Sequence, residues 1–194
     1  MSTPKNIGSF RKATLSDADF VLFSNPAFWR AKSKELHRAA LVVAKQVGED
    51  WAALMRNAEA KDAGHITDIP DPPTNIMPQF VLLAAFSLEN MLKGLILFKE
   101  PGLVTGGKTT DVLRSHDLIA LADRAGVQLT DDEANLCKLA SSASTYWGRY
   151  PISNSVGTYI DSYGIGGESI AEFENLFSRL EDIYLVQARG RSAG

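Results

Sequence analysis

The sequence predicts an all-α fold, a helical bundle of about five helices with a long loop before the last helix. Apolar residues recur at spacings of three and four along several segments, capping signals precede most of those segments, and no convincing strand is visible. The chain has 194 residues, of which 45% are hydrophobic and 22% charged. This ordinary globular mixture supports one domain with a real core. We expect an N-terminal extension over residues 1–25, a helical domain over 26–188 and a flexible tail over 189–194.

The first helix is expected to begin after Asn25, which has the character of an N-cap, with Pro26 at the first helical position. Its apolar residues, at helical spacing, run from Leu36 to Ala58 and define one face. Gly64 is the expected stop, because glycine adopts the left-handed conformation that ends many helices.

The second helix, from about Asn75 to Lys99, is apolar on nearly every side, which is typical of the central member of a bundle. Its narrow polar stripe consists of Glu89, Asn90 and Lys93. Glu89 and Lys93 are four residues apart and are expected to form an exposed pair that contributes a few tenths of a kcal/mol. Because these polar residues interrupt the most apolar stretch, we expect no membrane crossing there.

Two further helices have capping signals. Ser115 is expected to cap a short helix that ends at Gly126. Thr130 and Glu133 form a capping box, in which each side chain accepts the other's backbone N–H, at the start of a helix that runs to Trp147. A second box, from Ser169 to Glu172, is expected to begin the last helix, after a loop over residues 152–167.

The segment from Gly102 to Thr109 matches the phosphate-binding pattern G-x-x-x-x-G-K-[ST]. That motif works between a strand and a helix of a parallel sheet, whereas here it follows the end of a long helix. We therefore expect the match to be accidental and residues 102–115 to form a glycine- and threonine-rich loop.

Charge and composition exclude several classes of function. The net charge of −3 and the pI of about 5.6 give no strong basic field that would draw the whole protein to duplex nucleic acid or an anionic membrane, although a local basic patch stays open. Cys137 is the single cysteine, so it has no internal disulfide partner, and a core position is expected for it. His37, His65 and His116 are far apart, so neither a metal nor a cofactor is predicted. Without an apolar signal core near the N-terminus, we expect a cytoplasmic protein.

Polar residues that packing could bring together form the candidate site. They lie on the central helix and near the ends of the third and fourth helices: Glu89, Asn90, Lys93, Arg114, His116, Asp117, Arg149 and Tyr150. Structural roles stay open for them, because Asp117 near a helix start and Arg149 near a helix end both suit the helix dipole.

Four short stretches give the chain a family resemblance. They are SLENMLKG (87–94), HDLIALADRAG (116–126), LTDDE (129–133) and GRYP (148–151). In this order and spacing they resemble the HEPN family, the "higher eukaryotes and prokaryotes nucleotide-binding" helical domains, over about residues 75–151. The resemblance implies a helical bundle that is commonly dimeric. Many members are metal-independent ribonucleases with an Arg-x(4–6)-His motif, in which histidine acts on the ribose 2′-hydroxyl and arginine on the developing charge.

This chain lacks that motif, because no histidine follows Arg149 and because His116 follows Arg114 by only two residues. We therefore expect a non-catalytic, homodimeric HEPN-like protein that binds a nucleotide, RNA or a protein partner, as an accessory of a defence or toxin–antitoxin system. The expected binding residues are Glu89, Lys93, Arg114, Asp117 and Tyr150. If RNA binds, Lys108 and Arg149 join Lys93 and Arg114 as phosphate contacts, and Tyr146, Trp147 and Tyr150 are available for stacking.

Two alternatives stay open. One is a metal-independent endoribonuclease with His116 as the base and Arg149 as the charge-stabilising group. The other is a structural dimerisation module, for which the first helix, with Trp29 and Trp51, would supply the apolar face.

Overall fold

The all-α prediction is confirmed by the computed structural model, which describes residues 16–65, 69–105, 108–149 and 166–192. Seven α-helices occur in these ranges: α1 (Asp17–Phe23), α2 (Pro26–Asp62), α3 (Met77–Lys99), α4 (Asp111–Arg114), α5 (Leu118–Ala125), α6 (Asp131–Ser142) and α7 (Glu168–Ser192). A 3₁₀ turn (Pro101–Leu103), two very short strands and a π-helical turn (Ala143–Trp147) complete the described structure.

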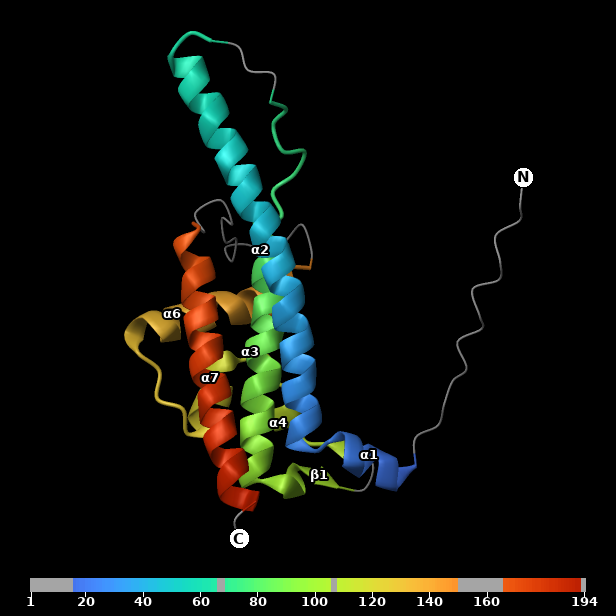
Figure 1. The fold of residues 1–194 in the computed structure, drawn as a ribbon. Coiled ribbons are helices and arrows are strands. Elements are labelled where there is room, and N and C mark those ends of the chain that lie inside the picture. The colour runs from blue at the N-terminus through green and yellow to red at the C-terminus, as the bar shows by residue number, and fades with distance from the viewer. Residues whose placement is uncertain (1–15, 66–68, 106–107, 150–165, 193–194) are drawn as a thin grey trace, which may run out of the picture.

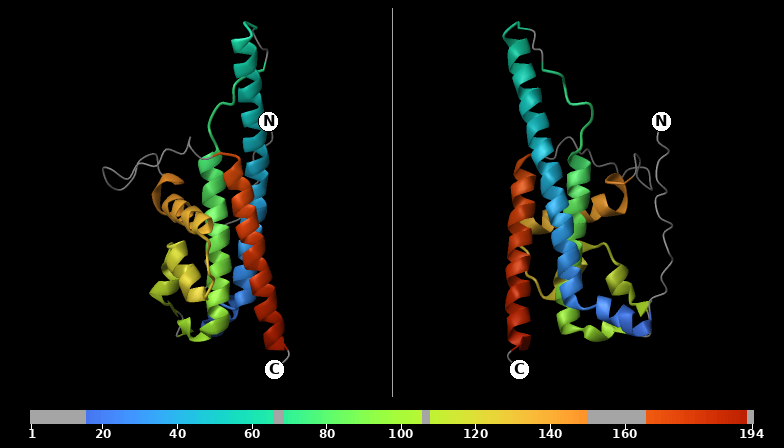
Figure 2. Two further views of the ribbon diagram at one scale, coloured as in Figure 1. Left: turned by 90° about the vertical axis from the view of Figure 1, so that its left-hand side faces the viewer. Right: turned by 45° about the vertical axis from the view of Figure 1, so that its right-hand side comes forward.

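Helix α3 occupies the centre, as its apolar sequence predicts. It packs against α2 and α7 on one side and against α5 and α6 on the other (Figures 1 and 2). Phe80, Leu88, Leu92 and Leu95 are among its fully buried side chains. By length and composition alone α3 could also cross a membrane, but 78% of its most apolar window is buried inside the bundle, as in the core helix of many globular proteins.

Helix α2 continues well beyond the bundle, as Figure 1 shows. At 1.5 Å per residue its 37 residues span about 55 Å, against about 35 Å for the 23 residues of α3. The predicted apolar face of α2 is therefore buried only as far as Val47, whereas Trp51, Leu54 and Met55 are exposed. The expected signals delimit this helix: the Asn25 side chain accepts from Ala27 N–H at its start, and Gly64 follows its end with a φ of +74°.

Several local expectations are wrong. Asp117, not Ser115, caps α5, because its carboxylate accepts from Ile119 N–H and Ala120 N–H. The expected capping box at Ser169 does not form, since α7 already begins at Glu168. Helix α7 extends into the expected tail as far as Ser192, and α1 lies within the expected N-terminal extension. The expected loop at 152–167 lies almost entirely outside the described residues.

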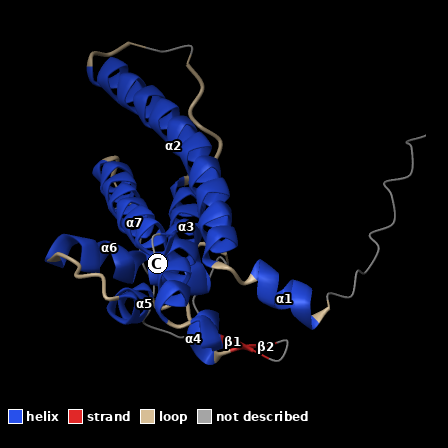
Figure 3. Ribbon diagram, turned by 60° about the horizontal axis from the view of Figure 1, so that its bottom comes forward, coloured by secondary structure: helices blue, strands red, loops and turns tan. Residues whose placement is uncertain are grey.

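The segment that matches the phosphate-binding pattern is structured, contrary to the expectation of a loop. After the 3₁₀ turn, β1 (Val104–Thr105) pairs antiparallel with β2 (Lys108–Thr109), and the single turn of α4 follows (Figure 3). These two strands have only two residues each, so the all-α prediction holds for the described residues. A two-residue antiparallel pair is still not the parallel sheet on which a phosphate-binding loop depends, so the described part of this segment lacks that framework.

Candidate functional site

The polar stripe of α3 holds a buried ion pair, not the exposed pair that the sequence predicts. Lys93 Nζ lies 2.5 Å from Glu89 Oε1, and the side chains are only 4% and 7% exposed. The spacing of four residues brings them together on one face of the helix. Helix α2 packs along this face, and the Trp29 ring centre lies 5.9 Å from Lys93 Nζ. Burial removes water from both charges, so the ion pair itself must compensate for the hydration that each charge loses.

His116 completes this cluster from the turn before α5. Its Nδ1 lies 2.8 Å from Glu89 Oε2, so Glu89 holds Lys93 with one oxygen and His116 with the other. The turn is fixed by the Asp117 cap and by Leu118 N–H, which donates to Ser141 Oγ at 2.9 Å. An ionised carboxylate only accepts hydrogen bonds, so beside ionised Glu89 the Nδ1 atom of neutral His116 carries the proton and Nε2 keeps its lone pair. The imidazole is 42% exposed, so a ligand can reach it.

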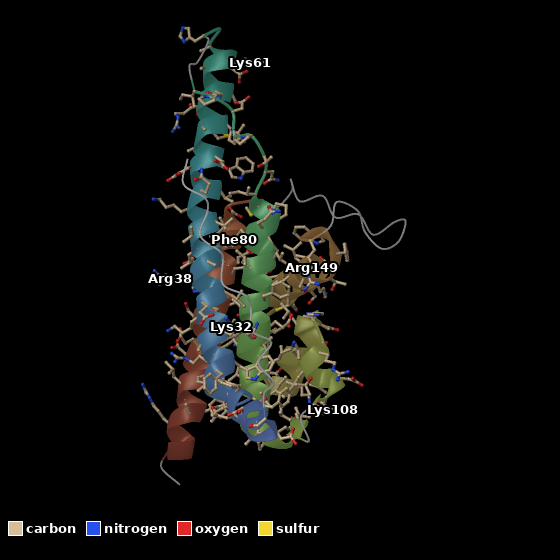
Figure 4. The ribbon with its side chains drawn as sticks, turned by 90° about the vertical axis from the view of Figure 1, so that its right-hand side faces the viewer. Lys32, Arg38, Lys61, Phe80, Lys108 and Arg149 are labelled. Atoms are coloured by element: carbon tan, nitrogen blue, oxygen red, sulfur yellow. The ribbon has the colours of Figure 1, made fainter. Side chains whose placement is uncertain are left out.

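Arg149 approaches the same place from the end of the fourth predicted helix. Its guanidinium carbon lies 5.1 Å from the centre of the Phe86 ring, and the His116 ring centre lies 6.3 Å from that of Phe86. The structure thus brings the two candidate catalytic residues to one aromatic side chain of α3. We call Phe86, His116 and Arg149 the Phe86 surface. Figure 4 labels Arg149 on the opposite side of α3 from Lys32 of α2.

The backbone that presents Arg149 packs closely against α3. The chain makes the π-helical turn Ala143–Trp147 and then reaches Gly148, where a Cβ would lie 2.8 Å from the carbonyl oxygen of Ala143 and 3.1 Å from Leu82 Cβ. Only glycine allows this approach without a shift of the neighbouring atoms. The π turn and Gly148 therefore set the position from which Arg149 contacts Phe86.

The other predicted site residues do not join this cluster. Arg114 is exposed and lies 3.5 Å from Asp111, one turn away. Asp117 acts as the α5 cap, Lys108 lies in β2, and Tyr150 lies outside the described residues. Trp147 donates from Nε1 to Ser142 Oγ and packs partly against the core, as its structural interpretation predicts.

Phe86 was missed by the sequence analysis, which assigned the apolar residues of the central helix to the core. The available signal was its position one turn before Glu89 and Asn90, on the side of the polar stripe. The Asn90 side chain is hydrogen-bonded to Phe86, because Asn90 Nδ2 donates to the Phe86 carbonyl oxygen at 2.7 Å.

Neither thiol nor metal chemistry is indicated in the described ranges. Burial, together with the nearby Glu133 carboxylate, raises the pKa of Cys137 to about 12, so the thiol is not an activated nucleophile. No group of three or more histidine, cysteine or acidic side chains in the described part of the chain is arranged to hold a metal ion. The Phe86 surface instead offers an oriented imidazole, a guanidinium and an aromatic face, which suit a phosphate ester attached to a flat base.

Comparison with protein-family models, curated proteins and solved structures finds no match to this chain. The HEPN resemblance and the function therefore depend on the residues and the geometry described above.

Proposed function

We propose that this chain is a HEPN-like binding protein that takes a phosphate-bearing ligand, single-stranded RNA or a nucleotide, on the Phe86 surface. The observation that carries the proposal is the convergence of His116 and Arg149 on one ring. The guanidinium is a strong donor to phosphate oxygens, and the half-buried Phe86 ring beside it offers an aromatic edge to an unpaired base. The HEPN resemblance adds the expectations of a homodimer and of a role beside a defence or toxin–antitoxin system.

The buried pair supports this proposal by positioning His116. Glu89, itself paired with Lys93, holds the imidazole at Nδ1, so the ring keeps one orientation without a ligand. A preorganised side chain loses less conformational entropy on binding, which favours affinity.

Binding is tested by fluorescence anisotropy of a labelled single-stranded RNA against the purified full chain. Arg149→Ala is expected to weaken binding at least about five-fold and, since one phosphate contact is lost, to flatten the plot of log K against log salt by about 0.7. Arg38→Ala, an exposed arginine on α2, is the matched control and should change neither value. Equal affinities for the wild type and Arg149→Ala would contradict the proposal.

A second candidate function, metal-independent RNA cleavage, is favoured by one specific observation, the Glu89–His116 contact. With Nδ1 held by the carboxylate, Nε2 can accept the 2′-hydroxyl proton while the ribose oxygen attacks phosphorus and the 5′-oxygen leaves. Arg149 would stabilise the charge on the phosphoryl oxygens. The 5′-oxygen takes a proton from solvent as it leaves, and the products would be a 2′,3′-cyclic phosphate and a free 5′-hydroxyl.

Cleavage is tested with several RNAs in EDTA. Catalysis by this pair predicts that His116→Ala and Arg149→Ala both abolish cleavage, whereas His65→Ala, beyond the end of α2, retains it. An inactive wild type on every RNA would exclude cleavage of these substrates and leave the binding function.

A further inference from the structure

We infer that the ligand's base is held in a second, aromatic pocket beside the Phe86 surface, an inference that rests on the proposed function. This base pocket lies between α1, α2 and α3 and has a volume of about 320 Å³. Three aromatic side chains and three polar ones line it: Phe23, Phe28, Trp29, Lys32, Glu35 and Asn90. Its volume falls at the lower end of the range typical of small-ligand sites.

The aromatic side chains are accessible to a ligand. Phe23 and Phe28 are 50% and 44% exposed, and their rings meet edge to face with centres 5.3 Å apart. Large apolar side chains that cluster on a surface commonly mark a binding site, whereas scattered ones do not. Aromatic faces without a fixed hydrogen-bond pattern are the usual platform for an unpaired base.

The base pocket and the Phe86 surface share helix α3. Asn90, which lines the pocket, lies one helical turn from Phe86, about 5.4 Å along the axis, and donates to the Phe86 carbonyl oxygen. Trp29, on the pocket's α2 side, also contacts Lys93 of the buried cluster. Figure 4 labels Arg149 and Lys32, which lines the pocket, on opposite sides of α3, so one strand of RNA has to cross α3 to place a phosphate at Arg149 and a base in the pocket.

The polar residues of the pocket predict which bases it accepts. Asn90 Nδ2 already donates to the backbone, which leaves its carbonyl oxygen as an acceptor, and Glu35 adds a carboxylate that also pairs with Lys32. Acceptors favour bases with an exocyclic amino group, such as adenine, over uracil.

The test compares three labelled RNAs of one length, an adenosine oligomer, a uridine oligomer and an abasic strand, with Phe28→Leu as the main variant. Leucine keeps apolar bulk but removes the ring. We expect Phe28→Leu to weaken binding of the adenosine oligomer at least about five-fold, as loss of base stacking implies, and to leave the abasic strand unchanged. Asn90→Ala should lower the ratio of the affinity for the adenosine oligomer to the affinity for the uridine oligomer. Val42→Ala is the control, because Val42 is an exposed apolar residue of α2 that does not line the pocket.

Failure of the pocket and failure of the proposed function give different results. If Arg149→Ala weakens binding of all three RNAs while Phe28→Leu binds each as the wild type does, the base pocket is overturned and the Phe86 surface stands. If Phe28→Leu weakens binding of the abasic strand as much as binding of the adenosine oligomer, the loss comes from a change in structure and not from lost base stacking. The proposed base pocket is then wrong. If neither variant changes any affinity, both proposals fail.

Discussion

The buried Glu89–Lys93 pair makes stability a sensitive test of this structure. Lys93→Met keeps the length and apolar stem of the side chain but removes its charge. Glu89 would then keep His116 as a partner on one oxygen and lose its partner on the other, inside a site where it is only 7% exposed. An ionised carboxylate without its counter-charge is strongly unfavourable in such a place.

The expected loss is large. Breaking a buried pair by removing one partner lowers the free energy of unfolding by about 3–5 kcal/mol, against about 0.3–0.5 kcal/mol for an exposed pair at this helical spacing. For a chain of this size that corresponds to a fall in Tm of about 10 °C. Removing both charges, with Glu89→Leu and Lys93→Met together, should restore most of the loss, because no unpaired charge then remains.

The assay is urea unfolding followed by circular dichroism, on the wild type, both single variants and the double variant. Lys45→Met, which removes an exposed lysine from a comparable pair with Glu49, should change stability by less than about 0.5 kcal/mol. A loss below about 1 kcal/mol for Lys93→Met would show that water reaches the pair. A double variant no more stable than Lys93→Met would contradict the argument from unpaired charge.

Three further predictions concern other parts of the fold. Gly64→Ala, at φ +74° and with open space around it, should destabilise by about 1 kcal/mol in thermal unfolding. Gly126→Ala, at φ +69°, should destabilise by about 2 kcal/mol, because the new Cβ also displaces Lys99 Nζ from its hydrogen bond to the Ala125 carbonyl oxygen; equal losses would show that this hydrogen bond contributes nothing. Burial tends to raise the pKa of Glu133, but hydrogen bonds from Arg179 and Thr130 outweigh it and leave the pKa below 4.5. The stabilisation by Arg179, about 1 kcal/mol in urea unfolding relative to Arg179→Gln, should therefore be complete above pH 4.5 and disappear as the pH falls through the lowered pKa; a constant difference down to pH 2.5 would contradict this. Cys137 should react with a thiol reagent at pH 8 only as fast as the chain unfolds, and rapid labelling of the native protein would show that it is accessible.

Signals that act within a few residues were predicted correctly. The Asn25 cap, the Thr130–Glu133 capping box and the glycines that follow α2 and α5 all lie where the sequence places them. Each depends on backbone groups one turn away, so the local sequence is sufficient. The same reasoning failed where two residues compete for one cap position. Ser115 and Asp117 are both suitable N-cap residues, but it is the Asp117 carboxylate that accepts from the free N–H groups of α5.

Contacts between distant residues were not predictable in this way. Glu89 and Lys93 were known to face each other, but only the packing of α2 over α3 buries them. His116 meets Glu89 across 27 residues, and Arg149 meets Phe86 across 63, so no spacing in the sequence indicates either contact. The sequence did name His116 and Arg149 as partners through the HEPN resemblance, without the ring that both of them contact.

The sequence by itself determined that this chain is helical and where most of its helices begin and end, because capping and amphipathic periodicity operate over single turns of backbone. Only the tertiary structure decided which charges lose contact with water and which side chains surround Phe86. Those outcomes depend on how whole helices pack, and one pair of residues four apart is compatible with either an exposed or a buried position until a neighbouring helix covers it.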